Sequence, residues 1–226
     1  MEEKKMKILM ITPYVTITGR PEFERNKTGF GYMVHDIAQA VGVLGKVDVL
    51  ATDSRGPSFD EGRVQYLKRS LLLFIMNMFK ILPLKYIKTM LSNYSMSKES
   101  SLRLWYYWLM TGYLSHILEK GNYDIVHIHG CAYCDEFWME LCKRKKIKYI
   151  VTLHGLNSFS EMVRVDNAGK QYERDFLKRV AEGEFPITVI STGMKKLIEK
   201  TYKAPDCKNI TVVCNSFSFD ELGGAN

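Results

Sequence analysis

The feature that most constrains this chain is a series of short, continuously apolar segments separated by stretches with helical periodicity. Strands are predicted over 6–12, 47–51, 64–67, 124–129, 147–153, 186–190 and 210–213, and helices over 31–43, 133–144, 170–181 and 193–202. Strands that are apolar on both faces and alternate with helices are typical of a parallel sheet covered by helices on both sides. We therefore predict a Rossmann-like α/β fold with a mostly parallel sheet of about six to seven strands.

Length and composition fit one large domain spanning 1–226. The chain has 226 residues, of which 46% are hydrophobic and 25% charged, so it can bury a core without disulfide bonds. Its five cysteines are an odd number, and the charged N-terminal sequence leads into an apolar run far shorter than a secretory signal needs. We therefore expect reduced thiols and a cytoplasmic location.

The chain carries a formal net charge of +7. Such an excess fits partners that bear phosphate, namely nucleotides, nucleic acid or an anionic membrane surface. It also fits lysines scattered over the surface, so charge alone does not choose among these classes.

Residues 68–120 interrupt the alternation of strands and helices. They contain the apolar runs LLLFIMNMFKIL at 71–82 and LRLWYYWLMTGYLSHIL at 102–118, neither of which reaches the ~20 clean apolar residues of a membrane span. We predict a helical insertion packed on the sheet. The alternative is a peripheral membrane patch, because basic residues flank or interleave the apolar ones: Lys68, Arg69, Lys80, Lys85 and Lys88.

Small and polar residues follow several predicted strands, at the edge where a parallel sheet binds its ligands. Thr12 ends the first strand, and Gly29 and Gly31 begin the helix after it. Glycines at a helix start let backbone amides approach a phosphate. The distance in sequence between strand and glycines is too long for a dinucleotide-binding turn.

Two histidines occupy equivalent positions at strand ends. His129 and His154 each close a predicted strand and are each followed by glycine. If these strands are parallel neighbours, both imidazoles face one crevice, where they can hydrogen bond to a phosphate or hydroxyl or act as acid or base. His127 lies within its strand, and we expect it to be a hydrogen-bonded core histidine.

The pair Cys131 and Cys134 supports an alternative function. A CxxC sequence between a strand and a helix is where a thioredoxin-like redox pair lies, and with His127 and His129 it offers zinc ligands. Against redox chemistry, the chain has at least six predicted strands in place of a small thioredoxin arrangement. Against zinc, no second CxxC or HxxxH completes a tetrahedral set. A binding module without catalysis is a third class that the sequence leaves open.

In their order along the chain, these segments resemble glycosyltransferase family 4, retaining enzymes of the GT-B fold. The resemblance rests on MKILMITPY, TGFGYMVHDIAQAVGVLGKVDVLAT, YDIVHIHG, YIVTLHGL, ITVISTGMKKLIEKTY and ITVVCNSFSFDEL, and covers nearly the whole chain except 68–120. The chain departs from the family at Thr28-Gly29-Phe30-Gly31, where a plain glycine pair is usual. It departs again at Ser216, where the family has glycine.

The resemblance implies roles for individual residues. Gly29 and Gly31 would approach the donor diphosphate, and His154 would be the catalytic residue that contacts the transferring sugar or its phosphate. The acceptor would lie against His129 and Thr12. Ser191, which is also a plausible helix cap, and Asn215 would contact the donor or a second domain.

The resemblance also implies the partners. The substrate would be a UDP- or GDP-linked hexose, with no metal or other cofactor, and the acceptor a saccharide or lipid-linked sugar, as in the synthesis of cell-surface polysaccharides. Residues 1–226 would form the acceptor-side N-terminal domain, and the C-terminal donor-binding domain would be absent, so we expect little or no transfer by this chain alone. A peripheral contact with the inner face of the membrane is also expected, and no nucleic-acid partner.

Overall fold

The computed structural model describes residues 5–24, 28–53, 57–93, 98–160 and 167–214. Its strands form one sheet in the order β3-β4-β2-β1-β5-β6-β7-β8. The strands are β1 (Met6–Thr12), β2 (Gly45–Ala51), β3 (Phe59–Glu61), β4 (Val64–Tyr66), β5 (Ile125–His129), β6 (Lys148–Leu153), β7 (Ile187–Val189) and β8 (Ile210–Val212). The α-helices are α1 (Gly29–Gly42), α2 (Leu71–Met76), α3 (Leu84–Asn93), α4 (Lys98–Gly121), α5 (Tyr133–Lys145), α6 (Asn167–Ala181) and α7 (Thr192–Tyr202).

The predicted α/β fold and the mostly parallel sheet are confirmed. Every strand pair is parallel except β3 with β4, which is antiparallel. The sheet has eight strands and not six to seven, because the sequence pattern does not predict β3. Its three residues, FDE, contain a single apolar side chain and so show no strand pattern, and the turn to β4 is made by Gly62 at φ 62°.

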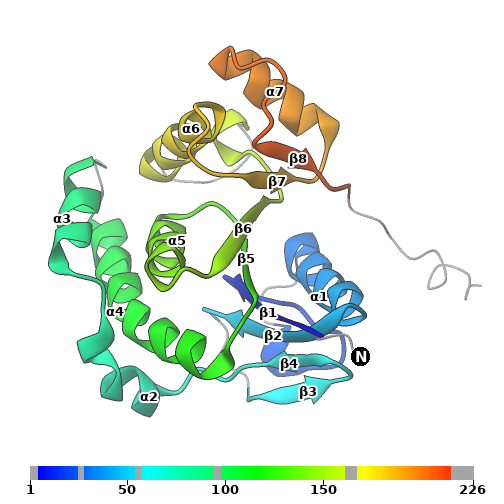
Figure 1. Ribbon diagram of the computed structural model, residues 1–226, viewed down its shortest axis with the longest axis vertical. Coiled ribbons are helices and arrows are strands. Elements are labelled where there is room, and N and C mark those ends of the chain that lie inside the picture. The colour runs from blue at the N-terminus through cyan, green and yellow to red at the C-terminus, as the bar shows by residue number, and fades with distance from the viewer. Residues whose placement is uncertain (1–4, 25–27, 54–56, 94–97, 161–166, 215–226) are drawn as a thin grey trace, which may run out of the picture.

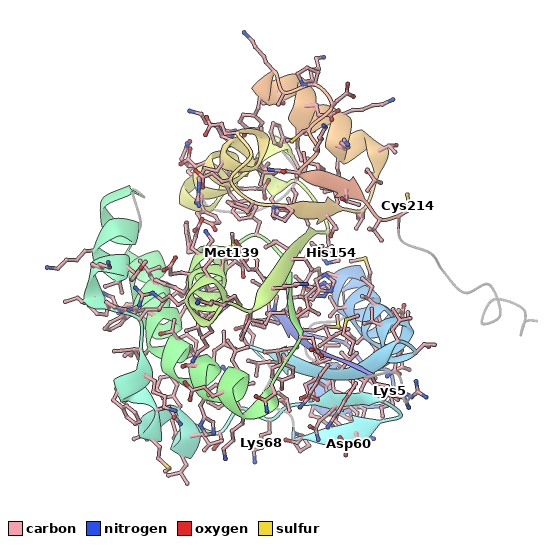
Figure 2. All side chains as sticks on the ribbon, in the orientation of Figure 1. Lys5, Asp60, Lys68, Met139, His154 and Cys214 are labelled. Atoms are coloured by element: carbon pink, nitrogen blue, oxygen red, sulfur yellow. The ribbon has the colours of Figure 1, made fainter. Side chains whose placement is uncertain are left out.

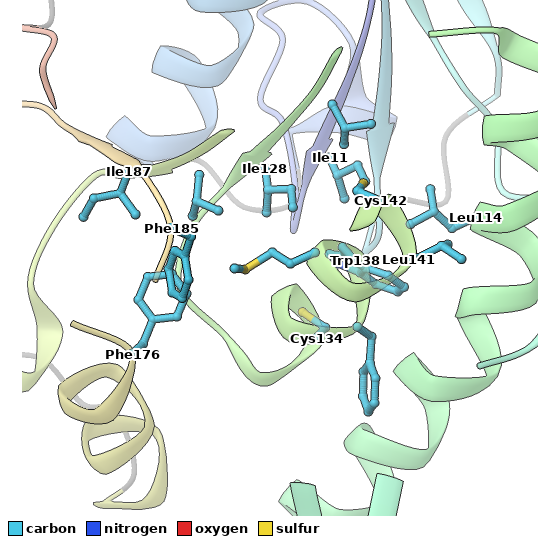
Figure 3. Close-up of a cluster of buried hydrophobic side chains, with 14 of the residues drawn as sticks. Ile11, Leu114, Ile128, Cys134, Trp138, Leu141, Cys142, Phe176, Phe185 and Ile187 are labelled. Carbon is cyan, nitrogen blue, oxygen red and sulfur yellow. The ribbon is translucent and has the colours of Figure 1, made fainter. Parts of the chain in front are cut away.

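Helices cover both faces of the sheet (Figure 1), with α1 on one side and α4 and α5 on the other. Each face has its own core. Between the sheet and α1 lie Met10, Val34, Ala38 and Val49, all fully buried or nearly so. The core of the opposite face is larger and is shown in part in Figure 3, where Trp138 of α5 packs near Ile11 and Leu114. The central strands are therefore buried on both faces, which explains their continuous apolar sequences.

The region 68–120 is the predicted helical insertion, and most of it packs on the domain. The long helix α4 lies against α5 and contributes Leu104, Trp108, Leu114 and Leu118 to the larger core. By contrast, α2 contributes no buried residue. Within the described residues, no helix is long and apolar enough to cross a membrane.

Candidate functional site

A cavity of about 720 Å³ opens at the edge of the sheet where the parallel strands end. The start of α1 forms one wall, and the segments that follow β1, β5, β6 and β7 form the others. His154, labelled in Figure 2, lies just beyond β6 at this edge. The lining residues are Tyr14, Gly29, Phe30, Tyr32, Met33, Asp36, Gly130, Cys131, Leu153, His154, Gly155, Asn157, Glu173 and Ile190.

The two predicted strand-end histidines contact each other. Parallel pairing of β5 with β6 sets His129 opposite Thr152, two residues before His154. The His129 Nδ1 and His154 Nε2 atoms are 2.9 Å apart, and the two rings are nearly parallel with centroids separated by 5.1 Å. His129 is only 1% exposed and lies behind His154, which lines the cavity. One nitrogen of this pair donates the hydrogen bond and the other accepts it, so each ring is held in one orientation by the other.

Both histidines are neutral at pH 7, because burial disfavours the charged imidazole. Burial lowers the pKa of His154 to about 4. It also lowers the pKa of His129 well below its usual value, and the neighbouring His127 and His154 lower it further. Among the described residues, His129 Nε2 and His154 Nδ1 have no hydrogen-bond partner although both atoms are buried. A buried polar atom without a partner is costly, so a polar ligand that reaches the His154 Nδ1 atom when the side chains covering it shift would gain a hydrogen bond there.

His127 is hydrogen bonded, as expected from its position inside a strand. Its Nε2 atom lies 2.6 Å from the Thr152 hydroxyl, which lies 2.5 Å from the Thr188 hydroxyl on β7. The rings of His127 and His129 are 3.9 Å apart between centroids. Polar side chains from three adjacent strands thus form a continuous row that ends at His129 and His154.

The start of α1 contributes a second wall. Thr28 caps the helix by accepting a hydrogen bond from the Gly31 amide, at 3.4 Å. The ring of Phe30 contacts the ring of His154 edge to face at 5.1 Å, and that of Tyr14 contacts Phe30 at 5.2 Å. Amides in the first turn of a helix have no carbonyl one turn earlier to bond, and the helix dipole there favours negative charge.

The two glycines of this helix have different environments. Gly29 lines the cavity, and a Cβ added there would meet no atom within 4 Å. Gly31 is buried and outside the lining, and a Cβ there would lie 2.1 Å from the Thr16 hydroxyl oxygen. Gly31 therefore permits close packing of the loop after β1, and its assignment to the diphosphate stays a prediction.

The other sequence-predicted site residues lie away from the lining. Thr12 is 1% exposed, and its hydroxyl donates to the Tyr14 carbonyl at 3.0 Å. The Ser191 hydroxyl caps α7 by accepting from the Met194 amide at 3.2 Å. Asn215 lies outside the described residues.

Glu173 is a site residue that sequence reasoning missed. Its buried carboxylate accepts hydrogen bonds from the amides of Asn157 and Ser158 and from the Ser158 hydroxyl, at 2.6–3.1 Å. Glu173 on α6 thus fixes the short helical turn η3 (Asn157–Phe159) that follows His154. Tyr14 and Phe30 were missed as well. No local pattern identifies any of the three, because only the tertiary fold brings them to His154.

The charge of the cavity is unusual for a phosphate site. Its described lining contains two carboxylates, Asp36 and Glu173, and no lysine or arginine. Neutral imidazole, aromatic rings and carboxylates suit a neutral, hydroxyl-rich molecule better than a diphosphate, whose charge calls for cations or several amides.

A family model described as Glycosyltransferase Family 4 matches residues 28–221. The chain belongs to glycosyltransferase family 4. The matched range begins at the cap of α1 and includes both strand-end histidines.

Among solved structures, this family 4 domain is similar to sucrose-phosphate synthase from Thermosynechococcus elongatus, with a TM-score of 0.56, 13% identity, and coverage of 95% of this chain and 49% of that one. An α,α-trehalose-phosphate synthase (UDP-forming) from Burkholderia xenovorans gives a TM-score of 0.48 at 11% identity, covering 85% and 42%. The first likeness supports the Rossmann-like fold of GT-B enzymes. The chain spans about half the length of these proteins. A search of curated proteins gives no match.

The alternative redox or zinc function at Cys131 and Cys134 finds no support in this family 4 domain. Both residues are free thiols, and burial raises the pKa of each well above its usual value, with Asp135 raising it further. A thioredoxin-like pair needs the opposite, a stabilised thiolate. Asp135, whose pKa burial raises to about 7, instead accepts a hydrogen bond from the Ala132 amide at the start of α5. Among the described residues, no group of His, Cys, Asp or Glu is arranged to hold a metal ion.

Proposed function

We propose that this domain takes part in the transfer of a hexose from a UDP- or GDP-linked donor to a saccharide or lipid-linked acceptor, and that His154 is the catalytic residue contacting the sugar. The observation that supports this most is the pair of histidines at the strand ends. His154 lines the cavity with its Nε2 atom held by His129 and its Nδ1 atom without a partner among the described residues.

The chemistry of this arrangement suits a sugar hydroxyl. A neutral imidazole can accept or donate one hydrogen bond at Nδ1, according to its tautomer, once the side chains that cover this atom shift, and its low pKa keeps it neutral at physiological pH. The ring of Phe30 beside it offers an apolar surface for the C–H face of a sugar. His129 acts as a positioning residue, since it contacts His154 and is itself buried.

The donor diphosphate would approach the first turn of α1 at Gly29, where free amides and the helix dipole favour an anion. The described lining supplies no cation to neutralise two phosphates. We therefore propose that most of the donor contacts come from a second domain, and that residues 1–226 form the acceptor-side domain. The chain alone would then show little or no transfer.

The test is histidine NMR on the chain, which has only five histidines and so gives a simple imidazole spectrum. A series of hexosides and of UDP- and GDP-hexoses is titrated into protein labelled with ¹⁵N at histidine. We expect the His154 signal to shift with at least one sugar, and His129 to follow it through their hydrogen bond. His35 and His116 lie outside the cavity lining and serve as internal controls. No shift at His154 with any sugar would overturn the proposed site.

A transfer assay tests the second part of the proposal. The chain is incubated with UDP- and GDP-hexoses and a panel of acceptors, and released nucleotide is measured. We expect no release above background. Turnover that His154→Ala abolishes and His116→Ala leaves intact would keep the site and refute the dependence on a second domain.

A further inference from the structure

The outer surface of α2 is apolar, and none of its residues lines the cavity that contains His154. All six residues of this helix are hydrophobic and none is buried. Phe79, in the following turn η2 (Met78–Lys80), is 78% exposed, and Leu72 is 67% exposed. We call residues 71–80 the α2 platform. Its exposed large hydrophobic side chains are Leu71, Leu72, Ile75, Met76, Met78 and Phe79.

This exposure is built into the fold, because polar contacts fix the inner side of the platform. The Ser70 hydroxyl caps α2 at its start, and the buried Asn77 side chain donates to the Leu73 carbonyl at its end. A Cβ on Gly112 of α4 would lie only 2.2 Å from the Asn77 carbonyl oxygen, so the platform rests directly on that helix. Lys80 pairs with Glu119, also on α4, at 2.5 Å.

The apolar surface continues onto α4. Leu102, Trp105 and Tyr106 are exposed there, and a cavity of about 480 Å³ lies between the two helices. Its lining includes Leu71 and Tyr106, whose hydroxyl accepts a hydrogen bond from Arg69 at 2.5 Å. Contiguous apolar surface of this kind on a folded domain indicates a binding surface.

The charge of the surrounding segment identifies the partner. Residues 62–98 contain seven lysines and arginines and no aspartate or glutamate, an excess as large as the net charge of +7 for the whole chain. Exposed Lys68 precedes α2, and exposed Lys85 and Lys88 follow it on α3. Pairing with a second copy would bring two positive surfaces together, whereas an anionic lipid surface satisfies both the charges and the apolar side chains.

We propose that the α2 platform docks this domain on the surface of an anionic membrane. The apolar side chains enter the region between headgroups and acyl chains, while the surrounding lysines contact lipid phosphates. Trp105 and Tyr106 fit the same boundary, since aromatic rings with a polar atom favour it. The interaction does not depend on the sugar-transfer proposal, because the cavity lined by His154 shares no residue with the platform.

The experiment is flotation of the chain with vesicles of phosphatidylcholine alone and of phosphatidylcholine with an equal part of phosphatidylglycerol. We expect binding to the mixed vesicles that weakens strongly at ~1 M salt, where charges are screened within about 3 Å. Leu72→Ser should weaken it about tenfold. Leu44→Ser, at 68% exposure just after α1, is the matched control and should change nothing.

Variants that remove lysine charges test the electrostatic part of vesicle binding. Lys68→Gln with Lys88→Gln should weaken binding about thirtyfold in total. Lys196→Gln with Lys200→Gln, both exposed on α7, should leave it intact. Circular dichroism checks that each variant is folded. Absence of binding by the parent chain to mixed vesicles at low salt, or equal losses for the Leu72 and Leu44 variants, would overturn the proposal. So would a dimer of the parent chain that Leu72→Ser dissociates.

Discussion

The cavity at the sheet edge and the α2 platform are opposites in how they depart from an ordinary protein surface. In the cavity, imidazole nitrogens are buried without a hydrogen-bond partner among the described residues. On the platform, large hydrophobic side chains are exposed around a polar anchor, the buried Asn77. Each region places groups where folding alone does not favour them.

This difference indicates two different partners. A small polar molecule can supply the hydrogen bond that a buried nitrogen lacks. An extended apolar surface can instead remove exposed apolar side chains from water. The two regions are also apart in the sheet, since α2 follows β4 and His154 follows β6, with three strands between them. At the usual strand spacing that separation is roughly 19 Å. Changes to one region should therefore leave the other intact.

Lowering the pH should give the largest effect that distinguishes the two regions. Burial lowers the pKa of His127 and His154 to about 4, below the usual 6.5. Between pH 6.5 and 4 the unfolded chain therefore binds protons that the folded chain does not, so the free energy of unfolding falls as the pH falls. The slope is at most about 1.4 kcal/mol per pH unit for each histidine. Denaturant titrations across this range should measure it, and His154→Gln should reduce it.

The local stability of the platform should not change over the same pH range. Hydrogen bonds from Lys145 and Lys80 lower the pKa of Glu119 to about 2, so the Lys80–Glu119 contact persists at pH 4. Hydrogen exchange followed by mass spectrometry should show that lowering the pH from 7 to 4.5 accelerates exchange more in peptides around His154 than in those from the platform, after correction for intrinsic rates. Equal acceleration in both regions would mean that the domain responds as one unit.

A pair of glycine substitutions gives the next largest effect and separates the regions by mutation. In Gly112→Ala the new methyl group meets the backbone oxygen of Asn77, which cannot move without the platform. In Gly31→Ala it meets the Thr16 side chain. Overpacking costs about 1–3 kcal/mol, partly offset by the higher helix propensity of alanine. We expect Gly112→Ala to impair vesicle binding and Gly31→Ala to impair the sugar response of His154, both with lowered melting temperatures.

Two further variants test whether the clash with Thr16 is what destabilises Gly31→Ala. Gly29→Ala adds the same methyl group to open space, so its stability should be unchanged or slightly higher. Thr16→Ala in the Gly31→Ala background removes the clashing hydroxyl and should restore part of the stability. Failure of this rescue would show that the remaining close contacts of the new methyl group, with the Thr16 Cβ at 2.9 Å and its backbone nitrogen at 3.0 Å, are enough to destabilise the variant.

The sequence predicted the main elements because central strands are buried on both faces, and their apolar runs stand out. It also identified His129 and His154, since strand ends of a parallel sheet meet at one edge. It did not reveal their direct contact, which depends on the register of β5 with β6. Nor did it reveal that Gly31 packs against Thr16, because a glycine needed for close packing looks the same in sequence as one that binds phosphate. Short β3, with one apolar residue, was missed for lack of any pattern.

Glu173→Gln has the smallest expected effect and tests how firmly the cavity wall is fixed. The two backbone amides donate to different oxygens of the Glu173 carboxylate, and glutamine keeps only one of these acceptors. One amide of Asn157 or Ser158 therefore loses its acceptor, and we expect a loss of about 1–2 kcal/mol in the free energy of unfolding. Glu182→Gln is the control, because Glu182 is exposed and pairs with Lys178 at 3.8 Å, a contact worth less than about 1 kcal/mol. Since η3 begins three residues after His154, the Glu173 variant should also broaden the His154 imidazole signal and weaken its response to sugars, while vesicle binding stays unchanged. An unchanged His154 signal in a destabilised variant would limit Glu173 to a structural role in α6.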